Sequence, residues 1–190
     1  MELVNNNSSI DIIIGPMFSG KTTELIRRLS ISSEAGYKVL YINSVLDVRG
    51  KGAFSTHNNT LSTNIKIDMT KTDNLEDLIT ECKLYDVIGI DEAQFFKDLK
   101  FFCIYISETY GKKVIVSGLN GDFERNPFGH INELITHCDT ITKLNSFCRM
   151  CCKKGVMNPG LFSKRMDINS KEQVVVGDKD LYIPVCRKCY

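Results

Sequence analysis

The sequence has no long apolar run. None of its uninterrupted apolar segments approaches the roughly 18 to 20 residues that a helix needs to cross a bilayer. The first residues, Met1 to Asn5, also lack the basic region and apolar stretch of a secretory signal. We therefore expect a cytoplasmic protein without a membrane partner.

The sequence also has almost no net charge, because 24 basic residues oppose 23 acidic ones. A dedicated nucleic-acid-binding protein would carry a basic excess toward the phosphates. The balance disfavours nucleic acid as a partner and favours a small-molecule substrate. Internal repeats and low-complexity tracts are absent as well, and the 43% hydrophobic content is ordinary for a folded globular protein.

Cysteine, in contrast, is abundant, and five of the eight cysteines follow residue 147. Four of them form two C-x-x-C units, Cys148 with Cys151 and Cys186 with Cys189, which can offer four thiolates to one Zn²⁺. A redox dithiol is the alternative, but it needs only one such unit within a thioredoxin-like fold. We predict structural zinc, because four thiolates leave no coordination position for substrate or water.

Short apolar runs alternate with helical patterns along most of the chain. We predict strands at residues 9–14, 39–42, 87–91, 114–116 and 141–144, and helices at 22–33, 75–85, 98–110 and 131–137. A half-exposed strand is predicted at 61–69, where apolar residues occupy odd positions. This alternation predicts an α/β domain with a mostly parallel sheet. Short strands and loops follow, so we predict domains at 1–145 and 146–190.

The loop after the first predicted strand carries a phosphate-binding motif. It fits G-x-x-x-x-G-K-[ST] between a strand and a helix, through Gly15, Pro16, Met17, Phe18, Ser19, Gly20, Lys21 and Thr22. In such loops backbone N–H groups and a helix N-terminus face phosphate oxygens. We predict that ATP binds here, with Lys21 at the β- and γ-phosphates and the Thr22 hydroxyl on Mg²⁺.

Asp91 and Glu92 end a predicted apolar strand, in the form of a Walker B motif. Asp91 is expected to help hold the phosphates' Mg²⁺. Glu92 is expected to accept a proton from an attacking hydroxyl or to orient a water, so the pattern permits either a kinase or a hydrolase. A solvated acidic pair is the remaining alternative, and the apolar strand disfavours it.

Several aromatic residues follow predicted strand ends, where parallel sheets bind their ligands: Phe95, Phe96, Phe123 and Phe128. They suit stacking on a planar base and core packing equally well. Lys164 and Arg165 are interpreted as solvated charge.

Four segments together resemble the type II thymidine kinases of animals, bacteria and large DNA viruses: residues 15–25, 89–96, 126–129 and 185–190. The resemblance runs in order from Ile10 to Tyr190. It implies a RecA-like α/β domain with the P-loop and a small zinc domain whose loop, the lasso, closes over a nucleoside. It further implies phosphate transfer from ATP to the 5′-hydroxyl of thymidine with Glu92 as general base, feedback inhibition by dTTP, and a homotetramer.

The resemblance also implies a thymine pocket. The side chains around the base would be Met17, Phe95, Leu119, Phe123, Phe128 and Ser163, the last where the family usually has Thr. The lasso would contribute Gln173, Val174, Val175, Val176, Gly177 and Tyr182, and Arg49 would lie near the phosphates. Two departures are Gly177-Asp178 in place of two glycines and Asp122, a carboxylate expected near the pocket wall.

Two further readings stay open at this point. Deoxyuridine or another nucleoside cannot be separated from thymidine by the pocket residues alone. An ATP-hydrolysing regulatory module, with its zinc knuckle on nucleic acid or a partner protein, is the alternative of a different class, and the balanced charge disfavours it.

Overall fold

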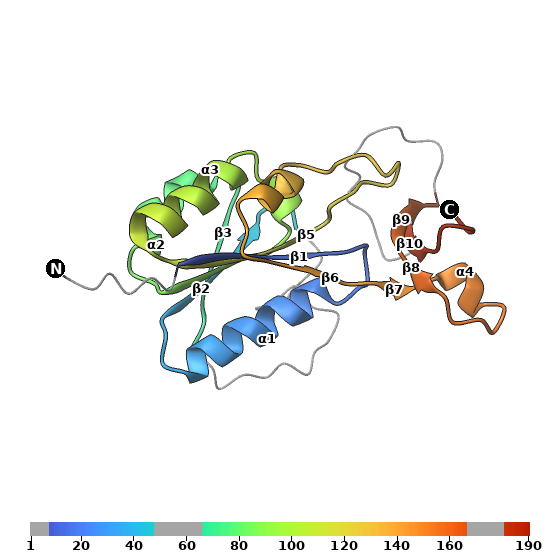
Figure 1. The fold of residues 1–190 in the computed structure, drawn as a ribbon, viewed down its shortest axis with the longest axis horizontal. Coiled ribbons are helices and arrows are strands. Elements are labelled where there is room, and N and C mark those ends of the chain that lie inside the picture. The colour runs from blue at the N-terminus through green and yellow to red at the C-terminus, as the bar shows by residue number, and fades with distance from the viewer. Residues whose placement is uncertain (1–7, 48–65, 167–180) are drawn as a thin grey trace.

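A six-stranded sheet forms the centre of the computed structural model, which describes residues 8–47, 66–166 and 181–190 (Figure 1). The strand order is β3-β2-β4-β5-β1-β6, and every pairing is parallel. The strands are β1 (Ser9–Ile14), β2 (Val39–Ser44), β3 (Asp68–Thr72), β4 (Val87–Ile90), β5 (Lys113–Gly118) and β6 (Thr140–Lys143). The predicted α/β class with a parallel sheet is confirmed.

Helices cover both faces of the sheet (Figure 1), which is why the inner strands are apolar runs rather than alternating patterns. On one face lies α1 (Lys21–Glu34), whose Leu25, Ile26 and Leu29 pack against β-strand residues such as Ile13. A Cβ on Gly89 of β4 would lie 2.5 Å from a methyl carbon of Leu29, so this helix approaches the sheet too closely for any side chain there.

The opposite face is covered by several shorter helices: η1 (Leu75–Leu78), α2 (Ile79–Cys82), α3 (Leu99–Ile104), the π-helix η3 (Tyr105–Thr109) and the 3₁₀ helix η4 (Ile131–Thr136). Their buried side chains, including Leu99 and Phe102, pack against Ile10, Ile12 and Ile14 of β1. Even and odd residues of β1 therefore serve the two different cores. Within the described residues no helix has the length and apolar character of a membrane span.

The secondary-structure prediction was accurate for the inner strands and α1 and less so elsewhere. The predicted helix at 75–85 is a 3₁₀ turn followed by one short α-helix, and the segment at 131–137 is 3₁₀. Of the strand predicted at 61–69, residues 61–65 lie outside the described residues, Asp68 and Met69 are in β3, and β3 continues beyond the predicted end to Thr72. This edge strand is mostly polar, and its pairing with Leu40 to Ser44 of β2 defines its extent.

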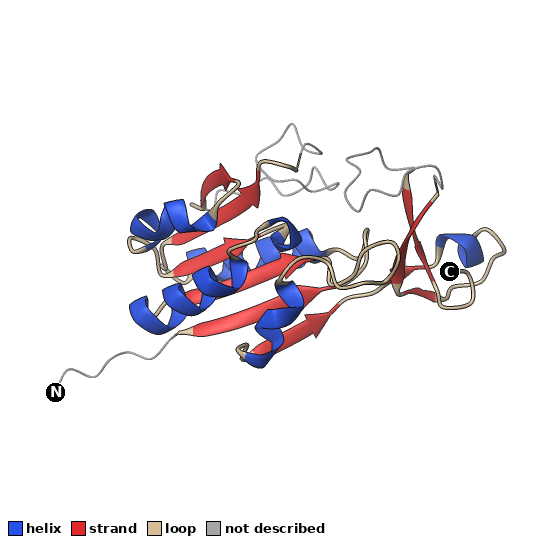
Figure 2. Ribbon diagram, turned by 90° about the horizontal axis from the view of Figure 1, so that it is seen from above, coloured by secondary structure: helices blue, strands red, loops and turns tan. Residues whose placement is uncertain are grey.

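The remaining residues form a small C-terminal part at one end of the molecule, which Figure 2 shows beyond the sheet. Its elements are β7 (Ser146–Phe147), α4 (Arg149–Cys152), β8 (Pro159–Gly160), β9 (Phe162–Arg165) and β10 (Tyr182–Val185). They form two antiparallel pairs, β7 with β8 and β9 with β10. Its apolar core consists of Ile183 and Val185 beside Cys148 and Cys186.

Candidate active site

The phosphate-binding loop joins the carboxyl end of β1 to α1 and is held by its own side chains. The Ser19 hydroxyl and the Lys21 ammonium both donate to the Pro16 carbonyl oxygen, at 2.8 and 2.9 Å. Gly20 adopts φ +82° at the helix N-cap, which favours glycine, and no side chain caps α1 there. No N-cap side chain therefore occupies the first N–H groups of α1, and a phosphate could accept hydrogen bonds from them.

Asp91 lies at the end of β4 and is fully buried against this loop. Its carboxylate accepts hydrogen bonds from Tyr41 Oη at 3.0 Å, Ser117 Oγ at 2.7 Å and the Thr22 hydroxyl. Burial and the negative charge of Glu92 raise the pKa of Asp91 above its ordinary value. The structure therefore brings together Thr22 and Asp91, the two residues predicted to hold Mg²⁺.

A third carboxylate, Asp47, adds to the negative charge at this edge of the sheet. Asp47 is buried and accepts a hydrogen bond from Asn43 Nδ2 at 3.0 Å. The pKa of Tyr41 is raised mainly by burial and further by the negative charges of Asp91, Glu92 and Asp47. Hydroxyl and carboxylate oxygens are the ligands that Mg²⁺ prefers. The oxygen donors fit a divalent cation, which would offset the concentrated negative charge.

Glu92 follows Asp91 directly and is also buried, with 7% of its surface exposed. A solvated acidic pair is therefore excluded. Its backbone is left-handed, at φ 49° and ψ 39°, which is unusual outside glycine. The carboxylate oxygen Oε2 accepts a hydrogen bond from Gln94 Nε2 at 2.6 Å. Sequence reasoning did not single out Gln94, because only the folded chain turns its amide toward Glu92.

The residues predicted to surround a base lie in two neighbourhoods. In the first, Phe95 and Phe128 meet edge to face with ring centroids 5.9 Å apart, and Leu119 follows β5 and donates its N–H to Gln94. Phe128 is buried and Phe95 half-buried, so the ring of Phe95 offers more open surface.

In the second neighbourhood the C-terminal part meets the phosphate-binding loop and the Phe123 loop. Ser163 Oγ of β9 accepts a hydrogen bond from the Met17 N–H at 2.9 Å. The Arg165 guanidinium lies 3.8 Å from the centroid of the Phe123 ring and donates from Nε to Tyr182 Oη at 3.0 Å. Arg49 and the stretch from Gln173 to Gly177 lie outside the described residues.

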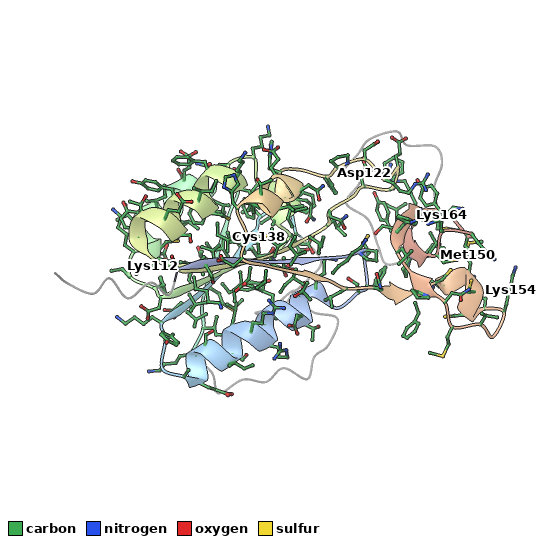
Figure 3. The ribbon with its side chains drawn as sticks, in the orientation of Figure 1. Lys112, Asp122, Cys138, Met150, Lys154 and Lys164 are labelled. Carbon is green, nitrogen blue, oxygen red and sulfur yellow. The ribbon has the colours of Figure 1, made fainter. Side chains whose placement is uncertain are left out.

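Two interpretations of charged residues require correction. Arg165 is 6% exposed and therefore is not solvated charge; its planar guanidinium stacks on aromatic rings, which the sequence pattern does not reveal. Lys164, labelled in Figure 3, is half-buried and donates to the Cys189 carbonyl oxygen at 3.3 Å.

Asp122, also labelled in Figure 3, was expected to place its charge near the pocket wall. In the structure its Oδ1 accepts hydrogen bonds from the N–H groups of Glu124 and Asn126, both at 2.9 Å, and its position relative to a pocket wall stays a prediction. Asp122 is 7% exposed and thus stabilises its own turn.

The four predicted zinc ligands converge in the C-terminal part. The sulfur atoms of Cys148, Cys151, Cys186 and Cys189 all lie within 4.8 Å of one another. A tetrahedron with zinc–sulfur bonds of about 2.3 Å has sulfur atoms about 3.8 Å apart, and Cys151 lies 3.8 Å from Cys186 and 3.6 Å from Cys189. Asn158 Nδ2 lies 3.3 Å from the Cys151 sulfur, a further donor toward a thiolate. Four sulfurs around one point suit a metal better than one redox pair.

Comparison with known proteins agrees with this geometry. The family model described as thymidine kinase matches residues 8–190. The chain belongs to the thymidine kinase family. The thymidine kinase of Myxoma virus (strain Uriarra) is 42% identical over 181 residues, covering 95% of each chain. That of Amsacta moorei entomopoxvirus is 42% identical over 187 residues, covering 96% of this chain and 97% of its own.

A cellular member of the thymidine kinase family is nearly as similar. The cytosolic thymidine kinase of Bos taurus is 39% identical over 181 residues, which cover 95% of this chain and 71% of the bovine protein. The family resemblance inferred from the motifs is confirmed.

Proposed function

We propose that this member of the thymidine kinase family transfers the γ-phosphate of ATP to the 5′-hydroxyl of thymidine, giving ADP and dTMP. The observation that carries the proposal is the convergence of Thr22, Asp91 and the buried Glu92 beside a phosphate-binding loop. A buried carboxylate beside a phosphate site suits a proton acceptor for a hydroxyl.

In the transfer, the thymidine 5′-oxygen forms a bond to the γ-phosphorus while the bond from that phosphorus to the β–γ bridging oxygen breaks. ADP departs with the electrons of the broken bond, and the 5′-hydroxyl proton goes to the Glu92 carboxylate. Residues 15–21 hold the phosphates, with Lys21 supplying positive charge. Thr22 and Asp91 would hold Mg²⁺, which neutralises phosphate charge when bound.

For the base, we propose the pocket implied by the family resemblance. Phe95 and Leu119 lie close to Gln94 and Glu92, and Ser163 contacts the phosphate-binding loop directly, which supports their participation. Met17, Phe123, Phe128 and Tyr182 complete the described portion. Arg49 near the phosphates and residues 173–177 over the base stay predictions.

We also propose that zinc is structural and that residues 1–145 and 146–190 are two domains. The four-thiolate donor set supports the first proposal, since it is complete without substrate. The separate hydrophobic cluster around Ile183 and Val185 supports the second. Feedback by dTTP, a homotetramer and a cytoplasmic location stay predictions.

The test is transfer of labelled γ-phosphate from Mg-ATP to thymidine, deoxyuridine, deoxycytidine and deoxyguanosine in parallel, with a control lacking acceptor. We expect labelled dTMP as the main product and little phosphate release without acceptor. Phosphate release that is independent of any nucleoside would instead support the ATP-hydrolysing alternative.

A further inference from the structure

Gln94 has no role in the proposed transfer, yet both ends of its side-chain amide form hydrogen bonds beside Glu92, the proposed proton acceptor. It lies in η2 (Ala93–Phe95) and is 4% exposed. Its Nε2 donates to Glu92 Oε2 at 2.6 Å, and its Oε1 accepts from the Leu119 N–H at 2.9 Å. One buried amide therefore joins Glu92 to Leu119, a proposed pocket residue.

The chemistry of these partners permits only one orientation of the amide. A carboxylate accepts hydrogen bonds and an N–H group donates them, so the amide nitrogen must face Glu92 and the amide oxygen must face Leu119. In a flipped amide the oxygen would face the Glu92 carboxylate and the nitrogen would face the Leu119 N–H, so neither hydrogen bond could form. The position thus requires one donor and one acceptor at fixed places, as glutamine supplies them.

Two neighbouring glycines, Gly118 and Gly129, leave the space that Gln94 occupies. A Cβ on Gly118 would lie 2.7 Å from Gln94 Oε1, and a Cβ on Gly129 would lie 2.2 Å from the Gln94 carbonyl oxygen. Gly129 also has φ +57°. Both the side chain and the backbone of Gln94 therefore occupy space that a side chain at either glycine would take.

The backbone of Glu92 is itself in an unfavourable conformation, at φ 49°. Such a residue persists only where its surroundings determine it, and these conformations concentrate at functional sites. Its N–H donates to Asp91 Oδ1 at 3.0 Å, which holds the backbone, while Gln94 holds the carboxylate. We infer that Gln94 is a positioning residue that fixes the Glu92 carboxylate for proton acceptance, an inference that rests on the proposed function.

During transfer the 5′-hydroxyl proton moves to Glu92, the 5′-oxygen to γ-phosphorus bond forms, and ADP leaves. Gln94 gains and loses no atom in this step. Its N–H restrains rotation of the carboxylate, and a misplacement of about 1 Å in an active site is enough to lower a rate about 100-fold. Loss of the amide donor should therefore lower kcat more than substrate affinity.

Two substitutions separate positioning from folding. Gln94→Leu removes both hydrogen bonds. Gln94→Glu keeps an acceptor for Leu119 but faces Glu92 with a second carboxyl, which donates when protonated and repels when ionised.

The experiment measures kcat for thymidine with Mg-ATP, equilibrium binding of ATP and of thymidine, and thermal unfolding. The variants are Gln94→Leu, Gln94→Glu, Glu92→Gln and the double variant Glu92→Gln/Gln94→Leu. Asn74→Asp is the matched control, because the Asn74 amide donates to the Asp77 carboxylate at 3.0 Å away from this site.

We expect Gln94→Leu to lower kcat about 10- to 100-fold with both affinities changed less than about threefold. The double variant should be no slower than Glu92→Gln alone, because Gln94 acts through Glu92. Gln94→Glu keeps the acceptor for Leu119 but loses the amide donor to Glu92, so it should lower kcat at least as much as Gln94→Leu. Asn74→Asp should keep kcat near that of wild type.

Two results would overturn the inference: unchanged kcat in both Gln94 variants, or a loss of kcat that follows unfolding or substrate affinity. If Glu92→Gln itself retains full kcat, the proposed role of Glu92 fails instead. The two failures are therefore distinguishable within the same set of variants.

Discussion

The α/β part and the C-terminal part of this chain are stabilised in different ways. Among the described residues of the α/β part, apolar clusters of nineteen and eight buried residues lie on the two faces of the sheet. In the described C-terminal residues the cluster has four buried members, and two of them are cysteines that belong to the proposed zinc site. So small a core buries too little apolar surface to order the chain by itself.

Besides this small core, the C-terminal part has four cysteine sulfurs that could hold a metal, and it makes contacts to the α/β part. Arg125 lies 4.1 Å from the centroid of the Tyr190 ring, and the Tyr190 hydroxyl donates to the Phe123 carbonyl oxygen at 2.6 Å. The Ser163 bond to Met17 reaches the phosphate-binding loop. The comparison teaches that the part with the smaller apolar core, whose four cysteines could hold a metal, also contacts the phosphate-binding loop of the α/β part.

The largest effect should follow from Cys186→Ser. Loss of one thiolate is expected to remove zinc and to lower thymidine kinase activity by orders of magnitude, because binding of the metal supplies the folding free energy of this part. The α/β part should keep its helical circular dichroism. Zinc content, activity and spectra are measured together, with Cys152→Ser as control, since Cys152 is exposed and outside the four-sulfur group. Full zinc and activity in Cys186→Ser would contradict the structural-zinc account.

A smaller effect is expected from Arg165→Lys, which tests the stacked contact between the two parts. Lysine keeps the charge but loses the planar group over Phe123 and the fork toward Tyr182, so the KM for thymidine should rise about tenfold while kcat changes less. Arg187→Lys is the control, because Arg187 is exposed and lies 5.2 Å from the Phe162 ring. Equal kinetics for the two variants would show that the contacts of Arg165 with Phe123 and Tyr182 do not support thymidine binding.

A smaller effect on KM is expected from loss of the hydrogen bond between Met17 and Ser163, which joins the two parts. Ser163→Ala leaves the Met17 N–H without its partner, at a cost of about 1 kcal/mol, so the KM for ATP or thymidine should rise roughly fivefold. Ser163→Thr keeps the hydroxyl and should behave as wild type. Steady-state kinetics compares the three proteins, and an identical KM in Ser163→Ala would show that this contact does not connect the part to the site.

The smallest effect concerns Asp11, in the α/β part and away from the site. Burial opposes its ionisation, but hydrogen bonds from Thr140 and Lys113 and the charge of Lys113 lower the pKa of Asp11 overall. A folded pKa below the unfolded value stabilises the fold above the unfolded pKa, and this stabilisation disappears as pH falls through the folded pKa.

Asp11→Asn should therefore lower the free energy of unfolding by roughly 1–2 kcal/mol at pH 7 and by less as pH falls below about 4. Activity at pH 7 should not change. Urea unfolding across pH checks this, with exposed Asp73→Asn as control. A loss of stability that is independent of pH would contradict the ionised state of Asp11.

The sequence predicted best those elements that depend on local patterns. β1 begins at Ser9 and ends at Ile14 as the apolar run indicates, and the phosphate-binding motif identifies both the loop and the start of α1. The four zinc ligands follow from their spacing. The end of β3 was predicted too early, because an edge strand with one face open needs few apolar residues and its sequence carries a weak signal.

The parts of the site that sequence could not predict depend on contacts between distant residues. The burial of Arg165 depends on Phe123 and Tyr182, and the inferred role of Gln94 depends on its contacts with Glu92 and Leu119. No local pattern distinguishes a buried cation or a positioned amide from solvated ones.

The most direct test of the account is the rate of labelled phosphate transfer from Mg-ATP to thymidine by Glu92→Gln, measured at saturating substrates together with ATP affinity. The account predicts unchanged ATP affinity and a rate at least about 100-fold below wild type, since only the proton acceptor is lost. A rate equal to that of wild type would contradict the assignment of Glu92 and the site built around it.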